Sequence, residues 1–190
     1  MITVVIPTLP ERADLLARAV ASVRAQTLSA DLAVEVDEHR EGAAAARNRA
    51  LERVATEWVA FLDDDDEFKP NHLRACLRAA ALMHADVVYP GYDVVGEDPV
   101  NCFGLPFQAR FLRQTNFIPV TTLCRTEAVL RVGGFQAHPD EFGNPCEDWG
   151  LWLALLDAGA SFRHLPQRTW IWHIRAGTTH RHPEVNDAVG

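Results

Sequence analysis

The sequence has few cysteines and no long apolar run. Its four cysteines lack the paired spacing of a zinc site and the density of a small disulfide-rich domain, so we expect buried, reduced thiols at Cys76, Cys102, Cys124 and Cys146. No stretch approaches the roughly 20 apolar residues of a membrane span. The first residues also lack the basic region and cleavage site of a secretory signal. We therefore expect a cytoplasmic protein without a membrane span.

The chain also lacks an excess of positive charge. Its formal net charge is −8, which argues against nucleic acid as the main partner, although Arg47, Arg49 and Arg53 lie close together. The loop after the first apolar run reads PTLPER, unlike the glycine-rich basic loop of a nucleotidyltransferase, and this disfavours that activity. No linker, repeat or low-complexity segment divides the 190 residues. This length suits one domain with a sizeable core.

The first half of the chain contains an alternation of strand and helix patterns. The continuous β-branched run ITVVIP predicts a strand buried on both faces, and DLAVEVD, EWVAFL and DVVYPGYDVV predict three more. Apolar stripes predict helices in ERADLLARAVASVRAQ and AAAARNRALERVA, and Pro70 opens a third helix. This order predicts an α/β fold whose parallel strands are joined by right-handed crossovers.

The second half is less regular. PFQARFLRQTNF predicts a short helix, TTLCR a strand, and TEAVLRVGGF a helix closed by Gly133 and Gly134. CEDWGLWLALLDAG predicts a helix with Glu147 and Asp148 in its first turn, where the helix dipole alone would favour acids. SFRHLP and TWIWHI predict two closing strands, and a polar tail follows Arg175.

Four consecutive aspartates, residues 63–66, follow the third predicted strand. Two carboxylates about 4 Å apart repel by about 4 kcal/mol at an effective dielectric constant near 20, so such a cluster favours a cation or exposure to water. Carboxyl ends of parallel strands meet at one sheet edge, where ligands bind. Mg²⁺ and Mn²⁺ prefer carboxylates together with diphosphate oxygens. A solvated acidic turn is the alternative. A phosphatase of the haloacid dehalogenase type is disfavoured, because Glu67 stands where its motif needs Thr or Val.

Four segments in order carry a resemblance to a known family: VVIPTLPERADLLARAVASVRAQT, AAARNRALERVATEWVAFLDDDDEFKPNHL, VGGF and EDWGLWLALL. Together they resemble the inverting glycosyltransferases of family 2 with the GT-A fold, over residues 2–175. The resemblance implies a mostly parallel, Rossmann-like sheet flanked by helices, with a smaller mixed acceptor-side region. It also implies one domain over residues 1–190, divided into a nucleotide-sugar half (1–95), an acceptor and catalytic half (96–175) and a tail (176–190).

The implied activity is metal-dependent, hexosyltransferase-type transfer of one sugar from a nucleoside diphosphate sugar to an acceptor hydroxyl. Family frequency slightly favours a UDP-sugar over a GDP-sugar, while the sugar, the acceptor and the oligomeric state stay open. The alternative is a non-catalytic sugar-nucleotide or metal binding module on the same fold. The short acceptor half disfavours a processive synthase.

The resemblance also implies roles for single residues. Residues expected to bind the nucleotide are Thr8, Asp37, Arg47, Asp63 and Asp64, with Asp37 accepting hydrogen bonds from the base. Arg47 has a solvated helix arginine as its alternative. Asp65 is expected to contact the divalent cation, Mn²⁺ or Mg²⁺, and Asp66 to be solvated or to cap the turn.

The later acidic pair and the C-terminal histidines complete the expected site. Asp148 matches the general base that takes the proton of the acceptor hydroxyl. His173 is expected to be a metal ligand, with His180 as the alternative and a purely structural histidine as the other interpretation. Trp152 stands at helical spacing from the leucines that follow it and is expected in the core.

Overall fold

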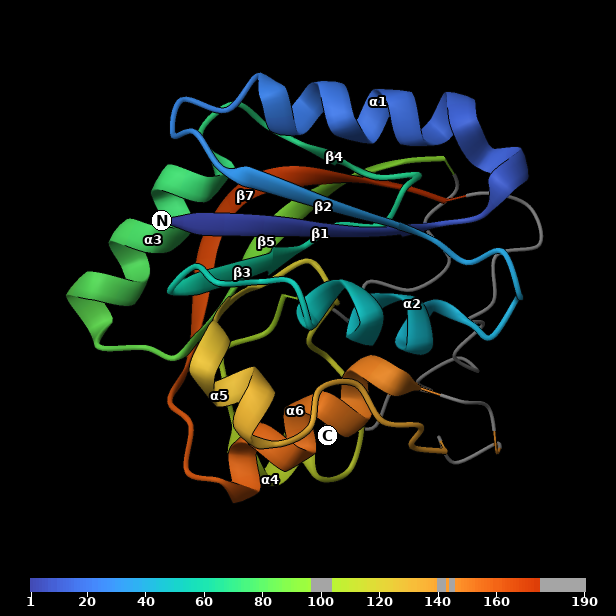
Figure 1. The fold of residues 1–190 in the computed structure, drawn as a ribbon. Helices are drawn as coiled ribbons and strands as arrows, with labels where there is room; N and C mark the ends of the chain where they lie inside the picture. Colours follow the sequence, from blue (N-terminus) through green and yellow to red (C-terminus); the bar gives the residue numbers. More distant parts are fainter. Residues whose placement is uncertain (97–103, 140–142, 144–145, 175–190) are drawn as a thin grey trace.

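The computed structural model describes residues 1–96, 104–139, 143 and 146–174, which form a mixed α/β fold (Figure 1). One sheet has the strand order β2-β1-β3-β6-β5-β7-β4. Its strands are β1 (Ile2–Thr8), β2 (Asp31–Val36), β3 (Trp58–Phe61), β4 (Glu67–Phe68), β5 (Val87–Val95), β6 (Leu123–Arg125) and β7 (Phe162–His173). The helices are η1 (Pro10–Arg12), α1 (Ala13–Arg24), α2 (Ala43–Leu51), α3 (His72–Met83), α4 (Ala109–Leu112), α5 (Thr126–Arg131) and α6 (Glu147–Asp157).

The sheet is parallel where the sequence shows its strand–helix alternation. β1 pairs in parallel with both β2 and β3, which confirms the parallel arrangement predicted for these strands. β6 then pairs antiparallel with both β3 and β5, while β5 and β7 pair in parallel. The carboxyl ends of β1, β2 and β3 therefore lie at one edge, where the predicted ligands Thr8, Asp37 and residues 63–65 end or follow these strands.

Helices cover both faces of the sheet (Figure 1). Along the fully buried β1, Val4 and Ile6 pack in the cluster that includes α1 and α3, whereas Val5 packs in the cluster that includes α2, α5 and α6. Trp152 is fully buried in the second of these clusters, which confirms its place in the core. None of the described helices has the length and apolarity of a membrane-crossing segment.

The thiols lie largely as expected. Those of Cys76, Cys124 and Cys146 are buried and free of disulfides, as predicted, while Cys102 lies outside the described residues.

The last strand differs from its prediction. The segments SFRHLP and TWIWHI form one strand, β7, so the prediction of two strands is wrong. Its pairing with β5 shifts register next to Gly91, where Pro90 faces Leu165 but Gly91 faces Arg168. The two residues left over, Pro166 and Gln167, form a β-bulge that bends the strand without ending it. The proline that reads as a break in the sequence marks this bulge.

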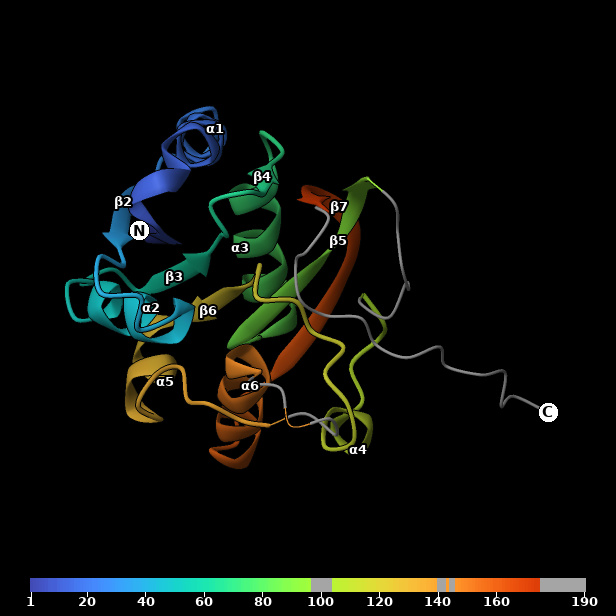
Figure 2. The same cartoon turned by 90° about the vertical axis from the view of Figure 1, so that its right-hand side faces the viewer.

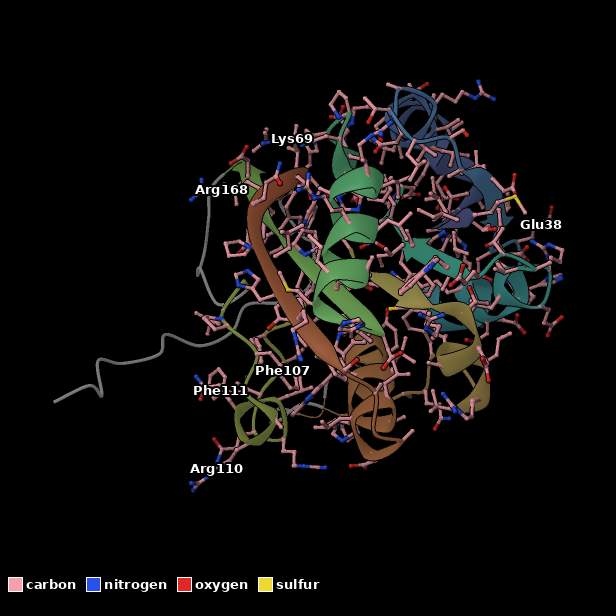
Figure 3. All side chains as sticks on the ribbon, turned by 90° about the vertical axis from the view of Figure 1, so that its left-hand side faces the viewer. Glu38, Lys69, Phe107, Arg110, Phe111 and Arg168 are labelled. Carbon is pink, nitrogen blue, oxygen red and sulfur yellow. The ribbon has the colours of Figure 1, made fainter. Side chains whose placement is uncertain are left out.

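The two-residue strand β4 has no pattern in the sequence, yet it positions the acidic turn 63–66. β4 pairs antiparallel with β7, so the turn connects β3 to the edge strand beside β7 (Figure 2). Figure 3 labels Lys69, which follows β4, and Arg168 of β7. Both form ion pairs with Asp93 of β5. These contacts fix the far end of the turn to β5 and β7.

Candidate active site

A cleft of about 600 Å³ opens at the carboxyl ends of β1 and β3. This volume is ordinary for a small-molecule site. All eight residues predicted for the site line it: Thr8, Asp37, Arg47, Asp63, Asp64, Asp65, Asp148 and His173. The cleft thus brings together side chains from both halves of the chain.

Asp64 is held in place by the end of β1. Its side chain is only 3% exposed, and its Oδ2 accepts a hydrogen bond of 2.6 Å from the Thr8 hydroxyl. Burial raises the pKa of Asp64 above its ordinary value, against the lowering effect of Thr8 and of Arg12. The expected residues Thr8 and Asp64 therefore contact one another directly, and each fixes the other's orientation at the cleft.

The other three aspartates of the turn form a carboxylate cluster. Asp63, Asp65 and Asp66 each offer one oxygen, and these oxygens lie within 4.8 Å of one another. Oxygen donors of this kind suit hard cations such as Mg²⁺ and Mn²⁺. The donor set therefore fits the divalent cation that the sequence implies, with Asp63 and Asp66 joining the predicted Asp65.

Burial alternates along the turn. Asp64 and Asp66 are buried, while Asp63 and Asp65 are partly exposed. Asp66 accepts a 2.9 Å hydrogen bond from the backbone N–H of His173, so the expectation that it is solvated is wrong. Burial, followed by the charge of Asp63, raises the pKa of Asp66 well above its ordinary value. A solvated turn does not describe these side chains, because two of the four are buried and accept hydrogen bonds from other parts of the chain.

Arg47 joins the acidic turn to the helix that carries Asp148. Its guanidinium forms ion pairs of 2.5 Å with Asp63 and 2.8 Å with Glu147, and it lies 5.1 Å from the centre of the Phe135 ring. The Arg47 side chain is 4% exposed. The alternative of a solvated helix arginine is therefore wrong. Whether Arg47 also contacts a nucleotide stays a prediction.

Asp148 lies in the first turn of α6, partly buried in the wall of the cleft. Its Oδ1 accepts a hydrogen bond of 2.8 Å from the backbone N–H of Trp149. Burial, followed by the negative charge of Glu147, raises the pKa of Asp148 to about 6. A carboxylate with this pKa is ionised at neutral pH, and it is a stronger base than an ordinary aspartate.

Asp37 follows β2 and also lines the cleft. Its carboxylate accepts hydrogen bonds from the backbone N–H groups of Glu41 at 3.1 Å and Gly42 at 2.7 Å, and from Arg49 at 3.0 Å. These bonds hold the loop that leads into α2. The predicted contact between Asp37 and the base stays a prediction, with about one of its four acceptor positions still available.

The ring of His173 contacts β4, the strand that follows the acidic turn, rather than the turn itself. Its ring Nε2 lies 2.8 Å from Oε1 of Glu67. Within the part of the chain that the structure describes, the cluster around Asp65 contains carboxylates and not His173. Its role as a ligand stays a prediction, and the alternative His180 lies outside the described residues.

Two arginines of the cleft wall were not predicted from the sequence. Arg12, from η1, contacts Asp64 at 3.0 Å and Asp65 at 2.5 Å, and Arg40 lines the cleft while pairing with Glu11. Neither lies in a periodic pattern that would indicate a site. The one usable signal for Arg12 is its position four residues after Thr8, in the loop that follows the first strand at the ligand-binding edge.

Comparison with known proteins gives both a family and a fold. The profile described as Glycosyl transferase family 2 matches residues 28–138. The pre-mycofactocin glycosyltransferase of Mycobacterium tuberculosis is 32% identical over 72% of this chain and 31% of its own length. The succinoglycan biosynthesis protein ExoO of Rhizobium meliloti is 28% identical over 78% of this chain and 46% of its own length. The matched region thus spans less than half of either relative.

Solved structures support the same conclusion for the fold. S. aureus TarS 1-349, solved in complex with UDP, superposes with a TM-score of 0.70 at 18% sequence identity, over 91% of this chain and 60% of that one. The complex of the same protein with UDP-GlcNAc gives a TM-score of 0.71. This likeness confirms the GT-A fold expected from the sequence. Because the family profile covers more than half of the chain, the protein belongs to glycosyl transferase family 2.

Proposed function

We propose that this domain is a metal-dependent inverting glycosyltransferase, which moves one sugar from a nucleoside diphosphate sugar to an acceptor hydroxyl. One observation carries the proposal: the carboxylate cluster of the acidic turn and the raised-pKa carboxylate of Asp148 line the same cleft. A divalent cation held by Asp63, Asp65 and Asp66 would act as a Lewis acid toward the departing diphosphate.

Asp148 is the group proposed to act on the acceptor. It takes the proton of the attacking hydroxyl, and a pKa of about 6 leaves it ionised for this task at neutral pH. Attack from the face opposite the diphosphate inverts the anomeric carbon, and no covalent intermediate with the protein is required. Arg47 forms an ion pair of 2.8 Å with Glu147, and this pair partly compensates the negative charge of Glu147 beside Asp148.

The proposed nucleotide contacts lie in the first half of the chain. Thr8 and Asp64 form one wall, and Asp37 fixes the loop that precedes α2. A UDP-sugar is our proposed donor, in keeping with the UDP and UDP-GlcNAc complexes of TarS. We accordingly assign the donor to residues 1–95 and the acceptor to residues 96–175 of a single domain; the tail (176–190) lies outside the described residues.

Thermal unfolding with UDP, GDP, TDP and CDP, each with Mn²⁺, Mg²⁺ or EDTA, tests the donor half of the proposal. A ligand at 100 times its dissociation constant stabilises by about 2.7 kcal/mol, or roughly 5 to 10 °C in a domain of this size. We expect such a shift with UDP and Mn²⁺, and its loss with EDTA or with Asp65→Ala. Asp157→Ala is the matched control, because Asp157 is 61% exposed and pairs with Arg113. No shift with any nucleotide would refute the donor assignment.

The catalytic half is tested with Asp148→Asn. This variant keeps the shape of the side chain and loses the base, so transfer should fall by about 100-fold or more while UDP affinity stays within a factor of two. A binding module without activity would have no transfer to lose in the unmodified protein. Full turnover in the variant would remove Asp148 as the base.

A further inference from the structure

Arg12 occupies the position where a cation is expected. A single nitrogen, Nη2, lies 3.0 Å from Oδ1 of Asp64 and 2.5 Å from Oδ2 of Asp65. Asp65 also contributes an oxygen to the carboxylate cluster with Asp63 and Asp66. The guanidinium therefore neutralises the same carboxylate that is expected to hold the metal.

Among the described residues, two arginines contact side chains of the acidic turn, and they are anchored very differently. Arg47 is 4% exposed on α2 and is held between Asp63 and Glu147. Arg12 is 32% exposed on η1, a helix of three residues, and its described ion pairs are both with the turn. Asp64 and Asp65 are only 3% and 14% exposed, so their carboxylates need a positive partner, whereas the guanidinium end of the pair reaches water and can be exchanged for another cation. Arg47 is a fixed element of the site, whereas Arg12 can leave.

A divalent cation and the Arg12 guanidinium exclude one another at Asp65 as long as no anion is present. Two positive charges that share one carboxylate repel each other strongly, because they lie only a few ångströms apart in a partly buried site. A diphosphate removes this conflict, because the planar guanidinium pairs with phosphate oxygens through paired hydrogen bonds. Arg12 also lines the cleft that would hold the diphosphate.

We propose that Arg12 is an internal counter-ion of the acidic turn, which competes with the metal when the cleft is empty and moves to the diphosphate when nucleotide is bound. This inference rests on the proposed function and adds a coupling to it: metal alone binds weakly, and nucleotide strengthens metal binding. By linkage, metal strengthens nucleotide binding by the same factor.

Mn²⁺ titrations followed by the paramagnetic resonance signal of free Mn²⁺ test the coupling without measuring activity. In Arg12→Gln, the affinity for Mn²⁺ alone should rise about fivefold to tenfold, while UDP affinity at saturating Mn²⁺ should fall by a similar factor. Arg12→Lys keeps the charge and loses the planar fork, so its Mn²⁺ affinity should stay near that of the unmodified protein while its UDP affinity falls.

Two arginine variants serve as controls for the loss of one positive charge. Arg53→Gln removes a charge that pairs with Glu35 outside the cleft, and Arg40→Gln removes one inside the cleft that pairs with Glu11. Both should leave the affinity for Mn²⁺ alone within about a factor of two.

The outcomes separate this inference from the function on which it rests. If the unmodified protein binds UDP with Mn²⁺ and Arg12→Gln binds Mn²⁺ alone no more tightly, the counter-ion role is wrong and the proposed function stands. If the unmodified protein binds neither Mn²⁺ nor any nucleotide diphosphate, both are wrong. If Arg40→Gln gains the same affinity for Mn²⁺ alone, then loss of any positive charge in the cleft has this effect, and the specific role of Arg12 is wrong.

Discussion

Arg47 of α2 and Glu147 of α6 lie 100 positions apart in the sequence and are joined by an ion pair of 2.8 Å. The same guanidinium holds Asp63 of the acidic turn. The first turn of α6, which carries Asp148, is thereby fixed to the turn that carries the carboxylate cluster. One buried side chain thus links the proposed donor and acceptor regions of the cleft.

Replacing Arg47 with alanine should destabilise the protein. The change leaves Asp63 and Glu147 without this partner, and we expect the free energy of unfolding to fall by about 3 kcal/mol. This is the low end of the range for breaking a buried ion pair, because both acids are partly exposed. Urea unfolding measures this loss. Arg53→Ala removes an exposed partner of Glu35 and should cost about 1 kcal/mol or less. Equal losses in the two variants would contradict the linking role of Arg47.

Asp148→Asn should change how stability depends on pH. Because the folded protein raises the pKa of Asp148 from 3.8 to about 6, folding favours its protonated form. Its stabilising contribution is therefore full below about pH 4 and is lost as pH rises through about 6. The neutral asparagine avoids this loss, so the variant should gain about 1 to 3 kcal/mol relative to the unmodified protein between about pH 4 and 7. A difference in unfolding free energy that does not vary with pH would contradict the assigned pKa.

The same pKa predicts the acid limb of the transfer reaction. As pH falls below about 6, Asp148 becomes protonated and the rate should fall about tenfold for each pH unit. Single-turnover rates with saturating donor and metal give the profile. A rate that stays flat down to about pH 4.5 would mean that a different group takes the proton.

Thr8→Val tests the hydrogen bond that orients Asp64. Valine keeps the branched shape on β1 but removes the hydroxyl that donates at 2.6 Å to the buried carboxylate. We expect a loss of about 1 to 3 kcal/mol in unfolding free energy and weaker nucleotide binding. Thr8→Ser keeps the hydroxyl and should recover most of the nucleotide affinity, which isothermal titration can measure. If the valine variant binds nucleotide normally, the wall formed by Thr8 and Asp64 has no part in recognition.

Gly134 and Gly159 form a matched pair for testing how α5 is fastened to α2. Both have positive φ, 75° and 81°, but a Cβ on Gly134 would lie 2.4 Å from Oδ1 of Asn48, whereas one on Gly159 meets open space. Asn48 forms two hydrogen bonds of 2.8 Å with the backbone of Phe135. Gly159→Ala should cost about 1 kcal/mol and Gly134→Ala about 3 kcal/mol in denaturant unfolding. Equal costs would mean that Asn48 moves aside freely.

The sequence predicted a helix or strand well where its buried residues follow a regular apolar pattern. β1, α1 and α3 each show an apolar run or stripe, and the structure has them close to the predicted positions. β4 has only two residues, too few for any periodicity, and it forms because β7 offers it backbone partners. Pro166 was misread as the end of a strand because sequence alone does not separate a break from a bulge.

The candidate site, too, could be predicted from the sequence only in part. Strand ends indicated which residues face the cleft, because the topology of parallel strands sets that edge. Four identical aspartates offered no means of telling the buried Asp64 and Asp66 from their partly exposed neighbours. The positions of Arg12 and Arg47 depend on partners 53 and 100 residues away, and no local pattern contains that information.

The four-residue length of the acidic turn has a consequence of its own. β3 is hydrogen-bonded to β6, β6 to β5, β5 to β7 and β7 to β4, and the turn then connects β4 back to β3. These connections form a closed ring: the turn is one link, and the remaining four links are ladders of backbone hydrogen bonds. Surface loops usually accept insertions because their ends are free to adjust. This one is fixed at both ends, so a deleted residue would pull on the two-residue pairing of β4 with β7, and an added one would shift the carboxylates relative to the cleft. The sheet therefore holds the acidic turn from both sides, and the positions of its carboxylates depend on strand pairing as well as on any ligand.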